Sequence, residues 1–308
     1  TKVRFDWKIN SDTIDRVAFV NFLPLEEADK LEKAATLTLI QEAAPVIPDN
    51  RLGDSLAVVT IINRLQLLSP WDMSENMQYW DNITLWRSTD KEILSGEVPR
   101  EAIGRVRDLD ISYFNTEEGV PEEIKHLKYL ETLSLYGNIN STTKSIKLCE
   151  EVATLDYLKD LRIGAMGLVS LPSNFAELGD TLETLDLNSN NLTSIPEVIN
   201  AENFPHLKSL DLSSNRRTAL SSLTNVNNAG IYVNMREKED IRRLLLWENL
   251  EELSLSYDYF EGAIPDFKVG EKGVRAYEQE DFVERGDTLN WAVEKRLPRV
   301  LPNMRSLR

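Results

Sequence analysis

The sequence is poor in the side chains that carry most enzyme chemistry, with one cysteine and two histidines among 308 residues. The lone Cys149 excludes an internal disulfide. Residues 146–152 space their apolar side chains as a helix does, which predicts a buried, unreactive thiol. His126 and His206 lie on separate stretches of the chain, and we expect both to be ordinary surface histidines that share no site.

Motifs for metal, phosphate or nucleophile chemistry (HExxH, CxxC, GxxxxGK(S/T) and GxSxG) are also lacking. We therefore expect a protein that is not an enzyme and that uses no metal and no cofactor. Carboxylates are abundant, and their number alone leaves a paired-acid mechanism open. Such a mechanism requires a water-poor pocket, which an evenly repeating surface does not provide.

Positive charge is scarce, since 35 lysines and arginines face 51 acidic residues and the formal net charge is −16. Nucleic acid and anionic lipid surfaces require clustered cations, so we expect neither as a partner. Basic or neutral proteins and polysaccharides remain candidates. No apolar run reaches the ~18 residues of a membrane-spanning helix, so no transmembrane segment is expected. The chain starts at Thr1 without a leader, and we expect any export signal or lipid-anchor segment to lie outside this sequence.

A leucine pattern with the frame L-x-x-L-x-L is the strongest positive feature. The first five copies start 24, 28, 24 and 25 residues apart. A period of this length is typical of solenoids in which every repeat contributes one strand. The six copies are Val106/Leu109/Ile111, Leu130/Leu133/Leu135, Leu158/Leu161/Ile163, Leu182/Leu185/Leu187, Leu207/Leu210/Leu212 and Leu250/Leu253/Leu255.

Two further features recur at fixed positions after the frame. An asparagine, or once an aspartate, follows the strand and can hydrogen-bond the backbone of neighbouring repeats, at Asn138, Asn190, Asn215 and Asp258. A proline turn then closes the repeat, at Pro121, Pro172, Pro196 and Pro265. This combination resembles the leucine-rich-repeat family, and in particular its plant-type and bacterial subclass. The resemblance covers residues 54–308 and implies an α/β solenoid, a horseshoe with short parallel strands on the concave side.

Two insertions interrupt the repeats of residues 106–308, near 216–249 and 266–303. The first contains residues 237–247, which predict a short helix on the convex side, and the second contains apolar residues within 277–296. Convex padding is the favoured interpretation, and a ligand-gripping excursion is the alternative. Met304 and Leu307 have the spacing of one more repeat beginning near the C-terminus.

Residues 54–105 are predicted to form a mainly helical N-terminal cap, because a solenoid exposes its first apolar layer unless another element covers it. A helical apolar pattern is followed by Trp71, Trp80 and Trp86. This order resembles the caps of bacterial cell-surface leucine-rich-repeat proteins. The tryptophans are interpreted as cap core, with a sugar-stacking platform as the alternative. Residues 1–53 begin with a strand-like alternation and continue with a helix-like segment at 25–43. They form either the end of an upstream domain or a helix packed on the cap.

The outward positions of the frame predict the ligand face. Strand stacking would align them in columns on the concave side, where they are acidic, small or hydroxyl-rich, and Tyr113 and Tyr257 flank the two ends. We expect these aspartates to be exposed and to keep ordinary pKa values. The ligand-binding candidates are Asp108, Asp110, Tyr136, Arg162, Asp186, Asn188, Asp211, Glu252 and Tyr257.

The function expected from the resemblance is non-enzymatic recognition of a protein partner by this concave face. The same resemblance implies a secreted or lipid-anchored lipoprotein on a bacterial cell surface. Carbohydrate binding through exposed aromatics is the alternative. Solvent-exposed tryptophans would favour sugar, whereas buried tryptophans beside an uncovered concave face would favour protein.

Overall fold

The structure is a computed structural model, and part of the chain is described by it. The described residues are 47–65, 67, 75–114, 119–138, 146–192, 194–215, 238–256, 258, 267–268, 270–276, 300–302 and 306–307. Most of residues 1–53, as well as Trp71, Tyr257 and the apolar segment within 277–296, lie outside this description.

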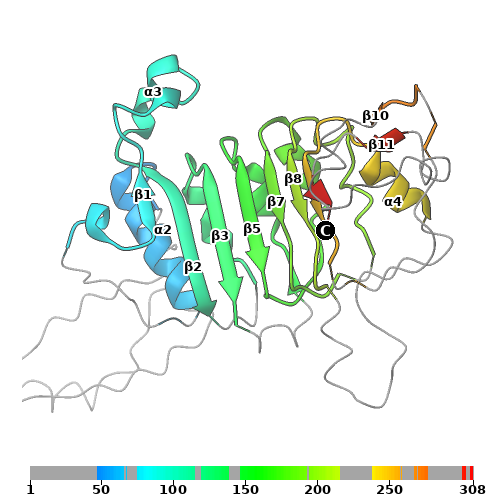
Figure 1. The fold of residues 1–308 in the computed structure, drawn as a ribbon. Coiled ribbons are helices and arrows are strands. Elements are labelled where there is room, and N and C mark those ends of the chain that lie inside the picture. The colour runs from blue at the N-terminus through cyan, green and yellow to red at the C-terminus, as the bar shows by residue number, and fades with distance from the viewer. Residues whose placement is uncertain are drawn as a thin grey trace, which may run out of the picture.

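One eight-stranded sheet runs along the molecule in the order β1-β2-β3-β5-β7-β8-β9-β12 (Figure 1). Its strands are β1 (Ile83–Leu85), β2 (Val106–Phe114), β3 (Thr132–Gly137), β5 (Asp160–Gly164), β7 (Thr184–Asp186), β8 (Ser209–Asp211), β9 (Glu252–Ser254) and β12 (Ser306–Leu307). Neighbours from β2 onward are parallel, and β1 adds an antiparallel edge that the sequence did not predict. Leu161 pairs with Leu185, which pairs with Leu210, so the predicted register of the leucine-rich-repeat solenoid is confirmed.

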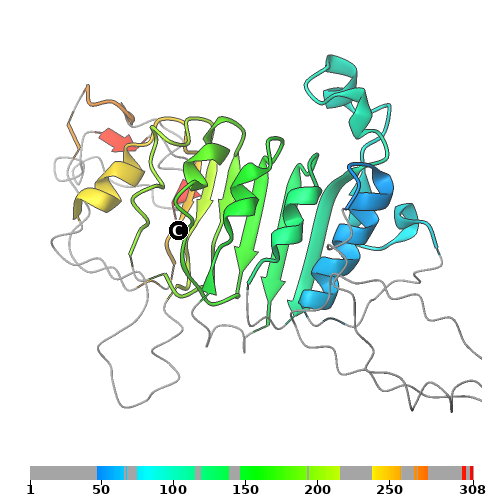
Figure 2. The same ribbon diagram turned by 180° about the vertical axis from the view of Figure 1, so that it is seen from behind.

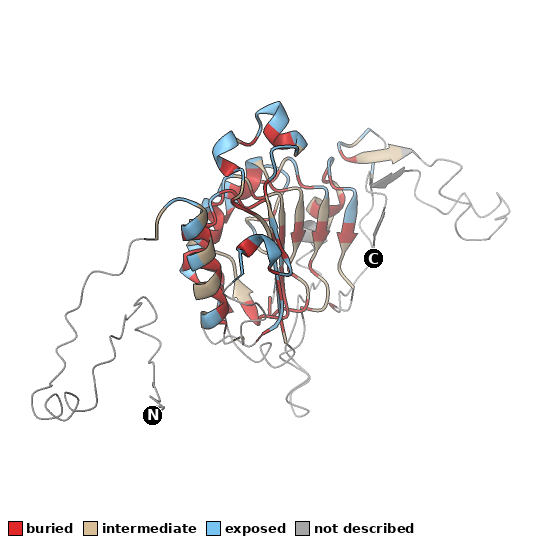
Figure 3. Ribbon diagram, turned by 90° about the vertical axis from the view of Figure 1, so that its left-hand side faces the viewer, coloured by how far each residue is buried: buried red, intermediate tan, exposed pale blue. Residues whose placement is uncertain are grey.

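The frame leucines form the core. Leu133, Leu161 and Leu185 are fully buried, whereas the residues on either side of each leucine along its strand are more exposed, as the colours of Figure 3 show. Burying each such side chain stabilises the fold by about 1.5–3 kcal/mol. Because each repeat buries its leucines against the next repeat, the core extends along the whole described solenoid.

The recurrent asparagines connect the repeats, as predicted. The side chain of Asn190 is completely buried and donates to the carbonyl oxygens of Ile163 and Leu187. Its Oδ1 accepts from the backbone amides of Met166 and Leu168. Backbone groups that leave the sheet ladder thus find partners inside the stack.

Asn215 and Asp258 continue this asparagine ladder toward the C-terminal end. The side-chain amide of Asn215 donates to the carbonyl oxygens of Leu187 and Leu212. The backbone amide of Asn215 donates to Oδ1 of the buried Asp258. Asp258 therefore occupies the place of the asparagine at the end of the described ladder.

Short 3-10 helices cover the convex side (Figure 2). They are η4 (Glu122–His126), η6 (Glu150–Thr154) and η7 (Phe175–Asp180). Two short strands, β4 (Ile146–Lys147) and β6 (Leu168–Ser170), form a second parallel sheet. The expected helical stretch around Cys149 is therefore wrong, because residues 146–147 pair as a strand and Cys149 precedes η6. Cys149 is half-buried, and burial raises the pKa of its thiol to about 11.

The described part of the cap is mainly helical. It consists of α2 (Arg51–Arg64), η2 (Met77–Tyr79), β1, α3 (Lys91–Ser95) and η3 (Arg100–Ala102). Helix α2 starts after Asn50, whose side chain accepts from the Gly53 amide, and it lies across the N-terminal end of the sheet (Figure 1). Ala57, Val58 and Ile61 on this helix are buried in the core.

Two of the three cap tryptophans are described, and both are buried. Trp80 belongs to the main core, and Trp86 lies in a smaller cluster beneath α3, where its Nε1 donates to the carbonyl of Tyr129 at 2.7 Å. For these two residues the cap-core interpretation is confirmed, and the sugar-stacking platform is wrong.

A buried ion pair joins α2 to the first repeat. Nη2 of Arg105 lies 2.7 Å from Oδ1 of Asp54, and Nη1 lies 2.9 Å from Asp49. The other carboxylate oxygen of Asp54 accepts from the Val106 amide at 2.8 Å. Because Asp54 and Arg105 are both buried, this contact fixes where β2 begins relative to the cap.

The first insertion contains α4 (Lys238–Leu245), which confirms the predicted helix. Arg243 donates to the carbonyls of Pro196 and Ile199 on the convex side of the preceding repeat, and Trp247 is buried beneath the helix end. The described part of the second insertion pairs β10 (Val274–Ala276) antiparallel with β11 (Val300–Pro302). Strand β12 then pairs with β9, so another repeat does begin at the end of the chain.

Candidate binding face

Three columns of side chains leave the open face of the sheet, in the register that the frame predicts. The middle column is Asp110, Ser134, Arg162, Asp186, Asp211 and Ser254. The column nearer the strand starts is Asp108, Thr132, Asp160, Thr184, Ser209 and Glu252. The third begins with Ser112, Tyr136 and Gly164. We call these columns together the concave face.

The concave face has a surplus of negative charge. Arg162 is the one basic residue in the first two columns, against six acidic residues. Its guanidinium donates to both carboxylate oxygens of Asp160, at 2.9 and 2.7 Å. This forked pair neutralises the arginine within its own strand, so the other aspartates of the face gain little from it.

Asp186 and Asp211 stand directly opposite each other on β7 and β8. Like charges in this arrangement are destabilising. Burial and the neighbouring Asp211 raise the pKa of Asp186, against hydrogen bonds from the amide and side chain of Asn188. The expectation of ordinary pKa values on this face is therefore wrong for Asp186. Asp186 is half-buried, and both donors of Asn188, in the turn after β7, bind its Oδ1.

Tyr136 lies flat across the neighbouring strand. Gly164 leaves the space for its ring, because a Cβ atom there would lie 2.4 Å from Cε2 of Tyr136. The hydroxyl of Tyr136 reaches Oδ1 of Asn188 at 3.2 Å, and the side-chain amide of Asn188 donates to Asp186 at 2.7 Å. The structure thus brings three of the predicted ligand residues into one connected group.

The remaining candidates are spread over the face. Asp108 lies near Arg107 at the cap end, and Asp110 is exposed beside it. At the opposite end Glu252 is exposed and close to Ser209. The predicted site is therefore a row along the described sheet with its most connected part in the middle, and Tyr257 falls outside the described residues.

Tyr113 was placed at the end of the face by sequence but was not among the predicted ligand residues. It is 83% exposed, and its backbone has a left-handed φ of 64°. The corresponding positions of later repeats, Ala165, Ser189 and Ser214, share this conformation with smaller side chains. Aligning the repeats would have identified Tyr113 as a candidate binding residue, because it is a bulky aromatic at a position where the later repeats have small residues.

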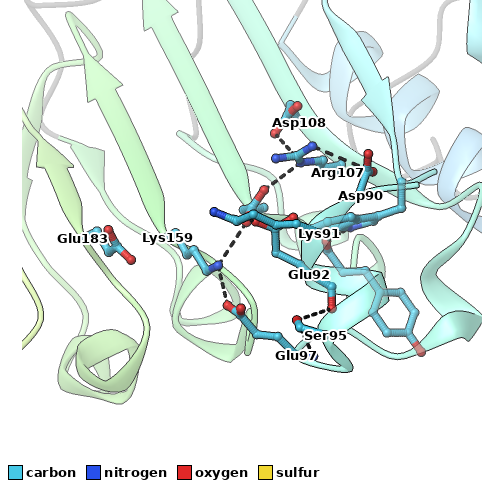
Figure 4. Close-up of polar contacts among 12 residues, drawn as sticks. Asp90, Lys91, Glu92, Ser95, Glu97, Arg107, Asp108, Lys159 and Glu183 are labelled. Carbon is cyan, nitrogen blue, oxygen red and sulfur yellow. Dashed lines mark hydrogen bonds and ion pairs between the residues drawn. The ribbon is translucent and has the colours of Figure 1, made fainter. Parts of the chain in front are cut away.

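A row of alternating charges follows the edge of the sheet where the strands start, and Figure 4 shows the part that includes Arg107, Lys159 and Glu183. Its members, at the second position of each frame, are Arg107, Glu131, Lys159, Glu183, Lys208 and Glu251. Nε of Arg107 lies 2.7 Å from Glu131, which also pairs with Lys159 at 3.2 Å. Lys159 also reaches Glu97, in the loop after α3. Sequence reasoning missed this row, although the alternation is visible once the repeats are aligned.

A hollow of about 810 Å³ lies against the same edge. It is lined by Glu97, Lys159, Asp180, Glu183, His206, Lys208 and their neighbours, whose polar side chains are exposed or half-buried. Ion pairs engage both lysines. The hollow is therefore lined mainly by polar groups that solvent can reach. Among the described residues no group of His, Cys, Asp and Glu is arranged to hold a metal ion.

Sequence comparison agrees with the observed repeats. Residues 180–225 match the family model described as "Leucine Rich repeats (2 copies)". The chain carries leucine-rich repeats. The sequence matches none of the curated proteins with which it was compared. No described helix of this leucine-rich-repeat solenoid is long and apolar enough to cross a membrane.

Solved structures that align with this chain include proteins from plants and bacteria. A plant ice-binding protein aligns at 21% identity over 68% of this chain and 65% of its own, with a TM-score of 0.46. A leucine-rich-repeat protein from Leptospira interrogans aligns at 27% identity over 52% and 33%, with a TM-score of 0.37. The ectodomain of a receptor kinase from Arabidopsis thaliana aligns at 18% identity over 68% and 95%, with a TM-score of 0.42. The solenoid thus spans less than two thirds of the first two proteins, and similarities of this strength carry no information on ligands.

Proposed function

We propose that this solenoid is a non-enzymatic recognition module that binds a protein partner through the concave face. The observation that carries the proposal is the column register, in which outward residues of successive parallel strands align on a sheet face that no described element covers. A rigid array of this kind is organised before binding, so association requires little ordering of the protein.

The tryptophans support protein over sugar as the ligand. Trp80, Trp86 and Trp247 are buried and serve the core, so the stacking platforms expected for a tryptophan-based sugar site are missing from the described part of the chain. Exposed Tyr113 is the specific feature that favours a glycan as the second candidate.

The proposed setting is the bacterial cell surface, with the protein secreted or held there by a lipid anchor. The proline-terminated repeats and the disulfide-free, tryptophan-containing cap support this setting through their resemblance to bacterial surface proteins. The acidic balance supports a basic or neutral protein as the partner.

Site-specific photo-crosslinking tests the proposal. A photoreactive amino acid replaces Ser134 in the centre of the concave face and, as a matched control, exposed Glu177 on convex η7. The two proteins are irradiated with a panel of purified candidate proteins, and adducts are mapped by mass spectrometry. Adducts from position 134 alone support the proposal, whereas equal yields from both positions overturn it.

Tryptophan fluorescence distinguishes carbohydrate binding from protein binding. We expect blue-shifted, acrylamide-protected emission that a panel of polysaccharides leaves unchanged, because the described tryptophans are buried. A polysaccharide that protects Tyr113 from chemical modification, with no protein adduct at position 134, would instead support carbohydrate binding.

A further inference from the structure

Two tyrosines lie uncovered at the strand-end side of β2 and β3, next to the cap. Tyr113 is 83% exposed and Tyr136 is 39% exposed. Ser112 pairs with Tyr136 across the two strands, and the register then shifts, so Tyr113 directly follows a concave-face position next to Tyr136. Tyrosine is among the residues enriched at the centres of protein interfaces.

Core packing does not explain Tyr113. A left-handed backbone conformation is strained for a non-glycine residue, and Tyr113 retains it with its side chain in water. In the later repeats the same backbone position carries alanine or serine. A smaller residue would serve the fold equally well, so the ring at position 113 requires another reason.

Acidic residues farther along the same sheet, on β7 and β8, supply the complementary part. Asp186 and Asp211 oppose each other on adjacent strands, and Asn188 links Asp186 to the hydroxyl of Tyr136. The one arginine of the middle column is already held by Asp160. The face therefore combines aromatic rings with two adjacent carboxylates, and Arg162, the cation opposite Asp186, is engaged by Asp160.

We propose that the occupant of the concave face is a basic protein segment, whose arginine or lysine side chains bind between Asp186 and Asp211 and stack on Tyr136 and Tyr113. This inference rests on the proposed function, and it adds the chemistry of the partner. A guanidinium bridges two carboxylates with forked hydrogen bonds, and its flat face stacks on an aromatic ring. Binding relieves the like-charge contact between the two aspartates, which strengthens the preference for a cation.

Charge complementarity distinguishes this occupant from the alternatives. A neutral glycan would stack on the tyrosines but would leave the paired aspartates uncompensated. A second copy of this chain carries the same net charge of −16 and would be repelled from an acidic face. A basic segment satisfies the rings and the carboxylates together.

The test uses a fluorescent oligoarginine peptide as the probe, with titrations of the full chain at physiological salt. Asp186→Asn combined with Asp211→Asn should weaken binding by about tenfold, since each lost carboxylate removes a charge-assisted hydrogen bond. The matched control combines Asp156→Asn with Glu177→Gln, two exposed residues outside the concave face. It changes the net charge equally and should alter binding less than about twofold. Equal weakening by both pairs would show diffuse attraction and overturn the inference.

Tyr113 provides a second, independent test. Tyr113→Phe should retain binding because the ring face makes the contact, while Tyr113→Ala should weaken it several-fold. Tyr113→Gly should weaken binding as well but raise the melting temperature, because glycine adopts the left-handed conformation without strain. If Tyr113→Ala binds like the parent, the aromatic part of the inference is wrong.

The two proposals fail in different ways. If a partner crosslinks to position 134 but does not compete with oligoarginine, the proposed basic segment is wrong and the proposed protein interface on the concave face still holds. Tight oligoarginine binding that depends on Asp186 and Asp211, together with competition by the crosslinked partner, supports both. Absence of crosslinks and of oligoarginine binding would overturn both.

Discussion

Asn190 shows how much of the solenoid depends on single buried side chains. Five backbone groups from two repeats form hydrogen bonds with the side-chain amide of Asn190, which is inaccessible to water. Leucines can be exchanged for other apolar residues of similar volume, but no apolar side chain replaces these bonds.

We expect Asn190→Ala to lower the free energy of unfolding by about 3–5 kcal/mol, since it leaves several buried backbone groups without partners. Urea unfolding followed by circular dichroism measures the change. Asn200→Ala is the control, because Asn200 bonds only within its own partly exposed turn and should cost about 1 kcal/mol or less. A loss below about 1 kcal/mol for Asn190→Ala would show that the stack tolerates unpaired amides.

Asp186 provides a prediction about pH. Its pKa is raised in the folded state, mainly by burial and also by Asp211 on β8, while Arg162 on β5 opposes the shift. The folded protein therefore holds the proton more tightly than the unfolded chain, and this stabilisation is lost as pH rises through the folded pKa. Asp186→Asn should raise the melting temperature at neutral pH, and the gain should vanish below the ordinary aspartate pKa of 3.8. A variant that melts lower than the parent at pH 7 would contradict this origin of the shift.

At the scale of elements, a buried ion pair and a hydrogen bond connect α2 to β2, in addition to apolar packing. Asp54 ties the helix to Arg105 and to the first amide of β2 in a buried setting. Replacing one partner of such a pair exposes the other to the full cost of burial without compensation.

Arg105→Met should therefore destabilise the protein by about 3–5 kcal/mol, because it leaves a buried carboxylate unpaired. The double variant with Asp54→Asn should recover part of the loss, since the charge is then removed from both sides. Thermal melts of the parent, the two single variants and the double variant give the coupling energy. Strictly additive effects would mean that the two side chains act independently.

At the scale of the whole molecule, two electrostatic effects have opposite signs. The net charge of −16 destabilises the folded state by repulsion, whereas the ion pairs along the edge where the strands start stabilise it. Exposed ion pairs contribute about 0–1 kcal/mol each, whereas repulsion among many like charges acts on the whole folded state. The balance should favour stabilisation by salt.

We expect the melting temperature to rise between about 0.01 M and about 0.15 M sodium chloride, as the screening length shortens from about 30 Å to about 8 Å. Differential scanning calorimetry at neutral pH measures it. A melting temperature that falls with salt would show that the alternating row contributes more than the repulsion costs.

Short-range sequence patterns were sufficient to predict the repeat register, the inward leucines, the asparagine ladder and the helix within residues 237–247. These follow from short-range periodicity, because a strand that buries one face must alternate and each repeat meets only its neighbours. The sequence also identified the outward columns, since their positions are fixed once the leucines are placed.

The interactions among the side chains of those columns could not be predicted from the sequence, because they depend on the folded arrangement. The pairing of Arg162 with Asp160, the space that Gly164 gives to Tyr136 and the shielding of Asp186 depend on rotamers and on loops beyond the strands. Residues 146–147 became a strand because the neighbouring repeat offers a pairing partner there, which helical spacing alone could not reveal. Local pattern specifies which face a residue occupies, whereas its charge state and its partners are set by contacts between segments distant in sequence.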